Sequence, residues 1–356
     1  MDRRWRGQTS KVIRQQVDIN TPTELCSYYR CDTTTGMIAF PLCPVIGPFL
    51  FLLLLTVSLH LPSTTAWSIK HDTDTDTNSH GLRDLTRTDF LSVAIGGIAA
   101  LGYGKLVGDT FTRISRGITY PTAHEFRVRT VIGRTLSEVS SVTHRPLQIL
   151  EVGIGTDCRL IRRGLYDEAL NDLAAKGVRD VHLMGMDIHL PSESTVKEAK
   201  VYLEQTTKRT LMNVNLQLLE GDLTSSSVSN NVPLAPGSVD AIICCLTLCS
   251  VNDLEAAIHS IKSLLRPNGG TLGFVEHVAV ENEEPFRSLD WQQQYLDPLQ
   301  QIVAHNCHLH RHTETTIETI FEVVSHQSTQ LLHERFLVND MWPVSCQCCG
   351  VIRRNS

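Results

Sequence analysis

The sequence predicts an α/β fold for residues 120–356, with a mostly parallel, seven-stranded sheet, helices on both faces and an antiparallel hairpin at its C-terminal edge. Three observations predict this fold. Short apolar runs alternate with longer amphipathic segments, which indicates parallel strands joined by helices. A glycine turn follows the first apolar run, as in sheets that bind a ligand beyond the carboxyl ends of their strands. Two apolar runs close the chain, and only a short turn around Trp342-Pro343 separates them.

Each strand is predicted from a short apolar run, and each helix from a longer segment with apolar residues at helical spacing. The first five strands are expected at 147–152, 181–187, 215–219, 239–246 and 271–277. The helices between them are expected at 157–175, 192–211 and 253–265. Two more helices, near 288–304 and 313–322, precede the closing strands at 330–338 and 345–353.

The residues before this domain form two segments, 1–66 and 67–119. Residues 1–36 are polar and are expected to be disordered. The apolar run 49–59 is too short for a spanning helix of roughly 20 residues, but it has the length of the apolar region of a signal peptide. Cleavage after Ala66 and retention as a membrane anchor both remain open.

The segment 67–119 contains a repeated Asp-Thr pattern, interpreted as a solvated linker, and a second apolar stretch. That stretch is interpreted as membrane-associated, as part of a targeting sequence, or as a helix packed on the main domain. Membrane association is expected through residues 37–61 or 90–108. The order of these segments resembles the bipartite presequences of complex plastids, and the endoplasmic reticulum membrane is the alternative destination.

Composition excludes several functional classes. The chain has 32 Lys and Arg against 38 Asp and Glu, a formal net charge of −6, so no basic surface for nucleic acid is implied. Its 11 cysteines in 356 residues are too few for a disulfide scaffold. Cys244 and Cys245 stand in an apolar run, which indicates reduced thiols in a core.

The first predicted strand ends in an acid and a glycine turn, Glu151-Val-Gly153-Ile-Gly155. The two glycines allow a sharp turn and a close approach of a ligand to the backbone. A dinucleotide site prefers a third glycine three residues later, where this chain has Cys158. An acid beside the turn also disfavours a pyrophosphate and suits a ligand that carries an ammonium group.

Two further acids follow the next strands. Asp187 ends the second strand, where a carboxylate can accept both hydroxyls of a ribose. A helix cap or a surface acid is the alternative interpretation of this residue. Asp222 follows the third strand, where a short polar side chain can accept the exocyclic amine of adenine.

In their order and spacing, these motifs resemble the class I S-adenosylmethionine-dependent methyltransferases, and the resemblance covers roughly residues 120–356 and implies a Rossmann-like fold. A second set of motifs is similar to the methyltransferase-like type 7 family, small membrane-associated thiol methyltransferases. These motifs are Leu246-Thr-Leu-Cys249-Ser-Val251, Val275-Glu276-His277-Val278, Trp291-Gln292-Gln293 with Asp297-Pro298, and Cys307-His-Leu-His-Arg311.

The resemblance implies a site for S-adenosylmethionine at the carboxyl edge of the sheet. Its expected residues are Glu151, Gly153 and Gly155 for the methionine end, Asp187 for the ribose, Asp222 and Leu223 for the adenine, and Leu246 beside the cofactor after the fourth strand. The chain departs from the family at Asp157, which stands where a glycine or small residue is usual. A carboxylate there would lie near the carboxylate of the cofactor.

The implied activity is in-line methyl transfer to a small acceptor, with an apolar thiol favoured. Because the sulfonium methyl is already activated, the chain must align the reactants and exclude water, and no metal is expected. His277 is the candidate base or substrate orienter, and Asp297 is the second candidate catalytic residue, on the segment expected to cover the pocket. The alternatives are a lipid or quinone methyltransferase at a membrane, a catalytically silent cofactor-binding protein, and a nicotinamide-dependent dehydrogenase.

Two segments rich in cysteine and histidine are interpreted as structural. The alternating residues from His305 to His312 have a spacing that would suit zinc. Cys307 and Arg311, however, match the family motif, whose members need no metal. The cysteines Cys346, Cys348 and Cys349 fall in the last predicted strand and are expected to pack in the core.

Overall fold

The structure of the protein is a computed structural model that describes residues 101–105, 122–139, 145–224, 234–280, 287–323, 327–338 and 341–355. All of them belong to one compact unit, 85–356. The predicted leader and anchor segments lie outside the described residues, except for residues 101–105. Among the residues that are described, no helix combines the length and the apolar character needed to cross a bilayer.

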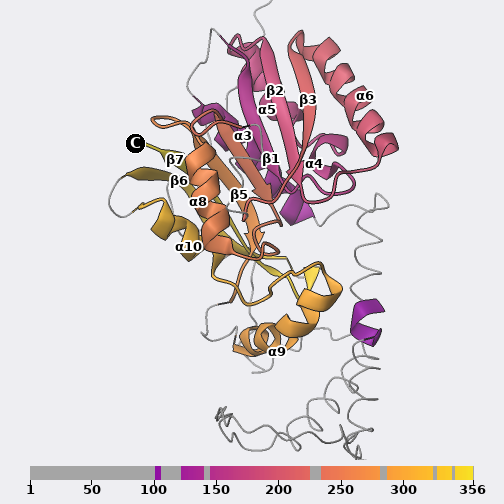
Figure 1. The fold of residues 1–356 in the computed structure, drawn as a ribbon, viewed down its shortest axis with the longest axis vertical. Coiled ribbons are helices and arrows are strands. Elements are labelled where there is room, and N and C mark those ends of the chain that lie inside the picture. Colours follow the sequence, from indigo (N-terminus) through magenta and orange to yellow (C-terminus); the bar gives the residue numbers. More distant parts are fainter. Residues whose placement is uncertain are drawn as a thin grey trace, which may run out of the picture. The chain divides into compact units, whose positions relative to one another are not determined.

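The sheet of the described domain has seven strands in the order β3-β2-β1-β4-β5-β7-β6 (Figure 1). β1 to β5 are parallel, and β7 runs antiparallel to both β5 and β6. The predicted mixed sheet with an antiparallel C-terminal hairpin is therefore confirmed. The strands are β1 Leu147–Val152, β2 Asp180–Asp187, β3 Asn213–Glu220, β4 Ala241–Cys245, β5 Thr271–His277, β6 Ser328–Leu337 and β7 Cys346–Arg354.

Helices cover both faces of this sheet (Figure 1). One face packs against α3 Thr122–Glu138, α4 Arg159–Arg162, α5 Asp167–Ala175 and α6 Glu193–Thr210. The other face packs against α8 Leu254–Leu264 and α10 Thr313–Ile320. α9, Arg287–Val303, lies past the end of the sheet.

The central strands are apolar on both sides because both faces are covered. In β1, Ile149 belongs to one buried cluster and Leu150 to the other, as the alternation of side chains requires. The parallel register continues this alternation into β4, where Ala241 pairs with Ile149 and Ile242 pairs with Leu150. This is why the strands appear in the sequence as continuous apolar runs.

Two helical features differ from the prediction. The single helix expected at 157–175 is interrupted, because Gly164 has a φ of 64° and the helix restarts as α5. A Cβ atom on Gly164 would lie 2.2 Å from the hydroxyl of Tyr202 on α6, so the break lets α6 pack closely. The helix α3 is not among the predicted helices. Its residues Val128, Val131, Ile132 and Leu136 have helical spacing and are buried.

Candidate active site

The turn after β1 is shaped by two glycines in the left-handed region. Gly153 has a φ of 75° and Gly155 a φ of 70°. The amide of Gly153 donates to the carbonyl of Met186 over 2.8 Å, which ties the turn to the end of β2. A Cβ atom on Gly153 would lie 2.0 Å from the hydroxyl oxygen of Thr247, so the turn after β4 also closes on this position.

Carboxylates crowd around this turn. Asp187 accepts the amide of Gly155 at Oδ2 over 2.9 Å, and Glu151 is 2% exposed below the turn. Burial raises the pKa of Glu151 to about 8, with smaller contributions from Asp157 and Asp187, although the hydroxyl of Tyr166 donates to its Oε2 over 2.9 Å. A cation bound beside these carboxyl groups would favour their ionised form, so the turn suits a cationic ligand.

Asp157 faces the same turn. Its Oδ1 lies 3.2 Å from the position that a Cβ atom on Gly155 would take. Burial raises the pKa of Asp157, and Arg162 and Arg163 oppose this effect. The departure from the family pattern at this residue therefore adds a third carboxyl group to the turn.

Asp222 and Leu223 lie beyond the end of β3. The Oδ1 atom of Asp222 accepts the amide of Thr224 over 2.8 Å and its hydroxyl over 2.7 Å. Leu223 is buried, and the amide of Gly221 donates to the carbonyl of Asp187 over 3.0 Å. The bond from Gly221 to Asp187 ties the ends of β2 and β3 together at one edge of the sheet.

The turn after β4 is held by one buried carboxylate. Glu276 accepts the amides of Thr247, Leu248 and Cys249 over 2.9, 3.0 and 3.3 Å. Burial raises the pKa of Glu276, and these amides act in the opposite direction. The turn begins at Leu246, which has a φ of 53° and donates its amide to the carbonyl of Val275 over 2.9 Å. Glu276 thus fixes the backbone next to the glycine turn after β1, which is expected to hold the cofactor.

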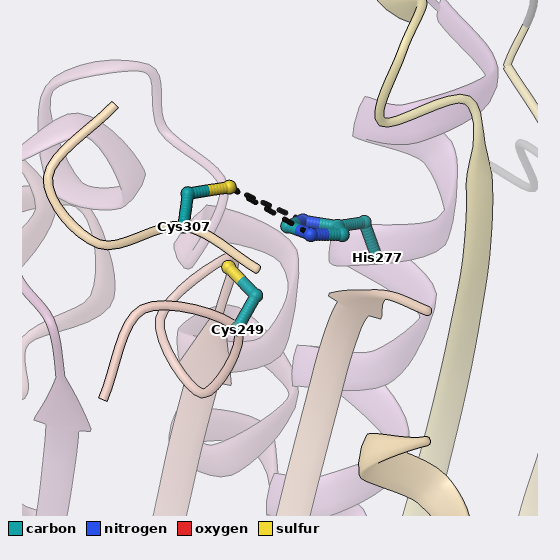
Figure 2. Close-up of side chains that lie close together, drawn as sticks. All are labelled: Cys249, His277 and Cys307. Carbon is teal, nitrogen blue, oxygen red and sulfur yellow. Dashed lines mark hydrogen bonds between the residues drawn. The ribbon is translucent and has the colours of Figure 1, made fainter. Parts of the chain in front are cut away.

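His277, the candidate base, is buried at the end of β5. Its Nε2 atom lies 2.6 Å from the carbonyl oxygen of His308, and because a carbonyl only accepts, this nitrogen donates. Cys307 Sγ lies 4.0 Å from Nδ1 and 3.7 Å from Nε2 of the same ring, and Cys249 stands beside both residues (Figure 2). Hydrogen bonding between the two thiols lowers the pKa of Cys307 and raises that of Cys249.

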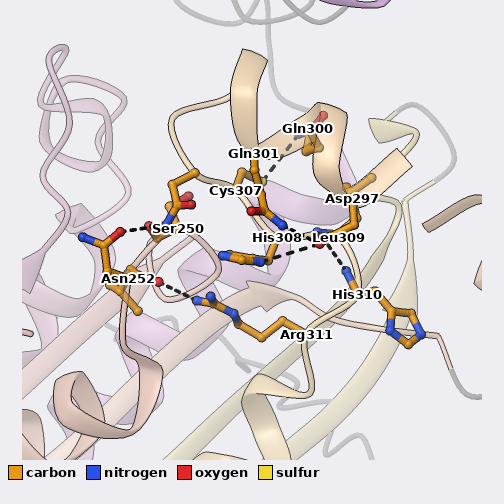
Figure 3. Close-up of polar contacts among 12 residues, drawn as sticks. Ser250, Asn252, Asp297, Gln300, Gln301, Cys307, His308, Leu309, His310 and Arg311 are labelled. Carbon is orange, nitrogen blue, oxygen red and sulfur yellow. Dashed lines mark hydrogen bonds and ion pairs between the residues drawn. The ribbon is translucent and has the colours of Figure 1, made fainter. Parts of the chain in front are cut away.

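Asp297, the other candidate, organises the loop after α9 (Figure 3). Its Oδ1 atom accepts the amides of Leu309 and His310, and its Oδ2 atom accepts from Nε2 of Gln301 over 2.6 Å. The loop is joined to the turn after β4, because Arg311 donates to the carbonyl of Leu248 over 3.0 Å. Asp297 therefore positions the segment that carries Cys307.

The structure divides the predicted site residues into two groups. Glu151, Gly153, Gly155, Asp187, Asp222, Leu223 and Leu246 lie along the carboxyl ends of β1 to β4. His277 and Asp297 lie with the loop after α9, next to the turn that follows β4. Their assigned roles stay predictions.

Two features of the site could not be predicted from the sequence: Tyr166 as the partner of Glu151, and the proximity of Cys249 to His277. Tyr166 carried no motif of its own. Cys249, His277 and Cys307 were all present in the quoted family motifs, but nothing in the sequence joined them. In the segment from His305 to His312, the Nε2 atom of His310 forms a hydrogen bond with Asp290 over 2.8 Å. The cysteines of the described residues are all buried, and none of them is in a disulfide.

Comparisons with known proteins agree with the fold. A family described as "Methyltransferase domain" matches residues 166–272. The human thiol S-methyltransferase TMT1A is 39% identical over 85 residues, which cover 24% of this chain and 33% of the relative. The human thiol S-methyltransferase TMT1B is 39% identical over 87 residues, with 24% and 33% covered. The match thus spans about a third of the length of these curated relatives.

Among solved structures, a putative sarcosine dimethylglycine methyltransferase from Galdieria sulphuraria is similar over 70% of this chain and 98% of that chain. It is 12% identical and has a TM-score of 0.44. Residues 166–272 of the seven-stranded domain thus match a methyltransferase domain, and over about a quarter of its length the chain is similar to the thiol S-methyltransferases.

Proposed function

We propose that this protein is a methyltransferase that moves a methyl group from S-adenosylmethionine to a small apolar thiol. The observation that carries the proposal is the pair of carboxyl side chains, Glu151 and Asp187, at one glycine turn. The resemblance to proteins named thiol S-methyltransferases supports a thiol as the acceptor.

The residues at this edge fit the cofactor. Glu151 is a buried carboxylate whose ionised form needs a cation, and the ammonium of the methionine end meets that need. The Oδ1 atom of Asp187 accepts a long hydrogen bond of 3.3 Å from the amide of His189. Its other lone pair can accept a ribose hydroxyl. Asp222 would accept the adenine amine, beside the buried Leu223. When bound, the cofactor supplies an electrophilic methyl group on a sulfonium sulfur.

The residues of the chain itself position the acceptor against the methyl group and exclude water from the site. Glu276 fixes the turn that begins at Leu246, and the loop after α9 lies against this turn. Holding an acceptor sulfur in line with the methyl carbon can supply on the order of 7–11 kcal/mol. A free thiol has a pKa near 8.5, so only modest help with deprotonation is needed, and His277 is the proposed base or orienter.

We also propose that the chain associates with a membrane through residues 37–61 or 90–108, at the endoplasmic reticulum or a plastid. The apolar composition of these segments supports this. Fluorescent fusions of residues 1–120 and 37–120 test it, since a diffuse distribution of both would contradict membrane association.

The activity is tested with the full chain and methyl-labelled S-adenosylmethionine against matched panels of thiols, phenols and lipids. Labelled thioether formed from apolar thiols is the expected product, and Asp187→Ala should abolish it. Label only in phenols or lipids would contradict the thiol assignment. Cofactor binding without transfer to any panel would identify a catalytically silent protein.

A further inference from the structure

Three side chains with metal-ligating atoms converge where separate segments meet. Cys249 comes from the turn after β4, His277 from the end of β5 and Cys307 from the loop after α9 (Figure 2). Their ligand atoms all lie within 4.8 Å of one another, and the residues are 2%, 1% and 6% exposed. Cys249 and Cys307 are 58 positions apart in the sequence, so folding alone brings the set together.

We propose that Cys249, His277 and Cys307 form a zinc site whose fourth position binds the sulfur of the acceptor. This inference rests on the proposed function, because it assigns the acceptor thiol a place. Of the two roles proposed for His277, it selects the orienter, since Nδ1 would hold the metal and could not act as a base. Two thiolates and an imidazole are ligands that zinc prefers, and three protein ligands with one open position are typical of its catalytic sites.

The distances fit this interpretation. Zinc–sulfur bonds of about 2.3 Å and zinc–nitrogen bonds of about 2.0–2.1 Å place sulfur and nitrogen about 3.6 Å apart in a tetrahedral site. Cys307 Sγ lies 4.0 Å from Nδ1 of His277. Nε2 lies 3.7 Å from the same sulfur but donates to the carbonyl of His308, so Nδ1 is the unprotonated nitrogen left to bind a metal. A metal-binding histidine commonly donates its other ring N–H to a carbonyl in this way.

Groups around the set also suit bound thiolates. Gln300 donates from Nε2 to Cys307 Sγ over 3.5 Å, and Tyr103 donates its hydroxyl to Gln300 Oε1 over 2.6 Å. Such outer contacts orient metal ligands and tune their charge. Arg311 lies close enough to Cys249 and Cys307 for electrostatic attraction, so its charge would offset that of an additional thiolate.

Other cysteine–histidine contacts in the described domain lack this arrangement. Cys245 Sγ lies 4.0 Å from Nε2 of His124, but no third ligand joins that pair among the described residues. A second group, Glu314, His333 and Cys348, is occupied differently, because Glu314 forms an ion pair with Arg335. The set at Cys249 is therefore the stronger candidate in the described part of the chain.

The set is joined to the glycine turn after β1 through the turn after β4. Cys249 stands two residues after Thr247, whose side chain occupies the space beside Gly153. A sulfur in the fourth position would lose its proton to water on coordination. Its lone pair would then bond to the methyl carbon as the bond from that carbon to the sulfonium sulfur breaks, and the sulfonium sulfur would keep that electron pair. The neutral thioether product is a poor zinc ligand and would leave.

Metal content tests the site without relying on activity. The full chain, expressed with zinc and dialysed, should hold about one zinc per chain. Cys249→Ser and Cys307→Ser should lower the affinity for zinc at least about tenfold, since losing an outer contact alone costs about 10- to 100-fold. Cys244→Ser is the matched control, because this thiol is equally buried but lies inside β4. Wild-type protein free of zinc, or serine variants that keep it, would overturn the proposal.

Cobalt provides a readout that needs no variant. Wild-type protein loaded with Co²⁺ should show thiolate-to-cobalt charge transfer, and phenylmethanethiol should strengthen that band. An unchanged spectrum would overturn the assignment of the fourth position.

Calorimetry with S-adenosylhomocysteine checks that each variant is folded. Metal-free protein that still methylates thiols would refute the zinc site and leave the proposed function standing, whereas zinc-loaded protein that methylates only phenols would refute the proposed function and the acceptor position together.

Discussion

The hydroxyl oxygen of Thr247 lies 2.0 Å from the position that a Cβ atom on Gly153 would take, so the side chain of Thr247 fills that space. That hydroxyl donates to the carbonyl of Val152 over 3.1 Å, so the turns after β1 and β4 are locked together. The turn at Gly153, after β1, and the turn at Thr247, after β4, are therefore one structural unit. A change at Gly153 should affect both turns.

Gly153→Ala should disrupt this unit. The new methyl group would collide with Thr247, and a φ of 75° is strained for alanine, so we expect a loss of about 1–3 kcal/mol in unfolding free energy. Affinity for S-adenosylmethionine should fall with it. Gly133→Ala on α3 is the control, because no atom lies within 4 Å of the added Cβ and the change should be neutral or stabilising. Denaturation and calorimetry measure both, and an unaffected G153A protein would contradict the proposed packing.

Asp187→Ala should remove the cofactor's ribose contact and leave the amide of Gly155 without its acceptor. Loss of hydrogen bonds to a charged group predicts a decrease in affinity of about 10- to 100-fold or more. Asp180→Ala, at the other end of β2, should bind normally. If the two variants exchanged these outcomes in calorimetry, the assignment of Asp187 would be wrong.

Glu151 should make cofactor binding depend on pH. Its pKa in the folded protein is about 8, above its ordinary value of 4.5. At a pH between these two values, the folded state therefore holds a proton that the unfolded state has lost. Stability of the cofactor-free protein should therefore fall as pH rises from about 4.5 to about 8.

Binding of a cation beside Glu151 requires its ionised form, so affinity for S-adenosylmethionine should weaken by up to about tenfold per pH unit below pH 8. Calorimetry at several pH values measures this slope. Glu151→Gln should bind weakly at every pH and lose the slope. A steep slope that persists in E151Q would assign the titration to another group.

Asp157→Asn should strengthen binding. The change removes a carboxylate that lies 3.2 Å from the Cβ position of Gly155, where the carboxylate of the methionine end is expected. Relief of repulsion worth about 1 kcal/mol corresponds to roughly a fivefold increase in affinity. Asp172→Asn, at an exposed position of α5, should have no effect. Weaker binding by D157N would show that this carboxylate assists the cofactor.

Asp297→Ala should act on the acceptor side alone. The amides of Leu309 and His310 would lose their shared acceptor, which predicts a loss of about 1–3 kcal/mol in stability and a raised KM for the thiol. Affinity for S-adenosylmethionine should not change. Asp297→Asn keeps one acceptor oxygen and should retain most activity; a collapse of kcat with normal stability in D297N would instead support direct participation in the reaction.

Much of the fold could be predicted because each central strand is a continuous apolar run between polar turns. β1 and β5 have the predicted bounds, and the closing hairpin follows from two strands with no helix between them. The break at Gly164 could not be predicted, because it depends on how Tyr202 packs from a helix that lies later in the chain.

The candidate site was predictable in part for a related reason. Glu151, Gly153 and Asp187 form local strand-end motifs, and parallel strands bring such ends to one edge. The convergence of Cys249, His277 and Cys307 depends on the path of the loop after α9. That path is set by contacts such as those of Asp297 with the backbone amides of Leu309 and His310, which no spacing in the sequence reveals.

A crystal structure of the full chain with S-adenosylhomocysteine tests the central claim most directly. The account predicts the ammonium group at Glu151, the ribose hydroxyls at Asp187 and the adenine amine at Asp222, with the chain of the ligand passing over Gly153. Density for the ligand elsewhere, or none beyond Gly153 at saturating concentration, would contradict it.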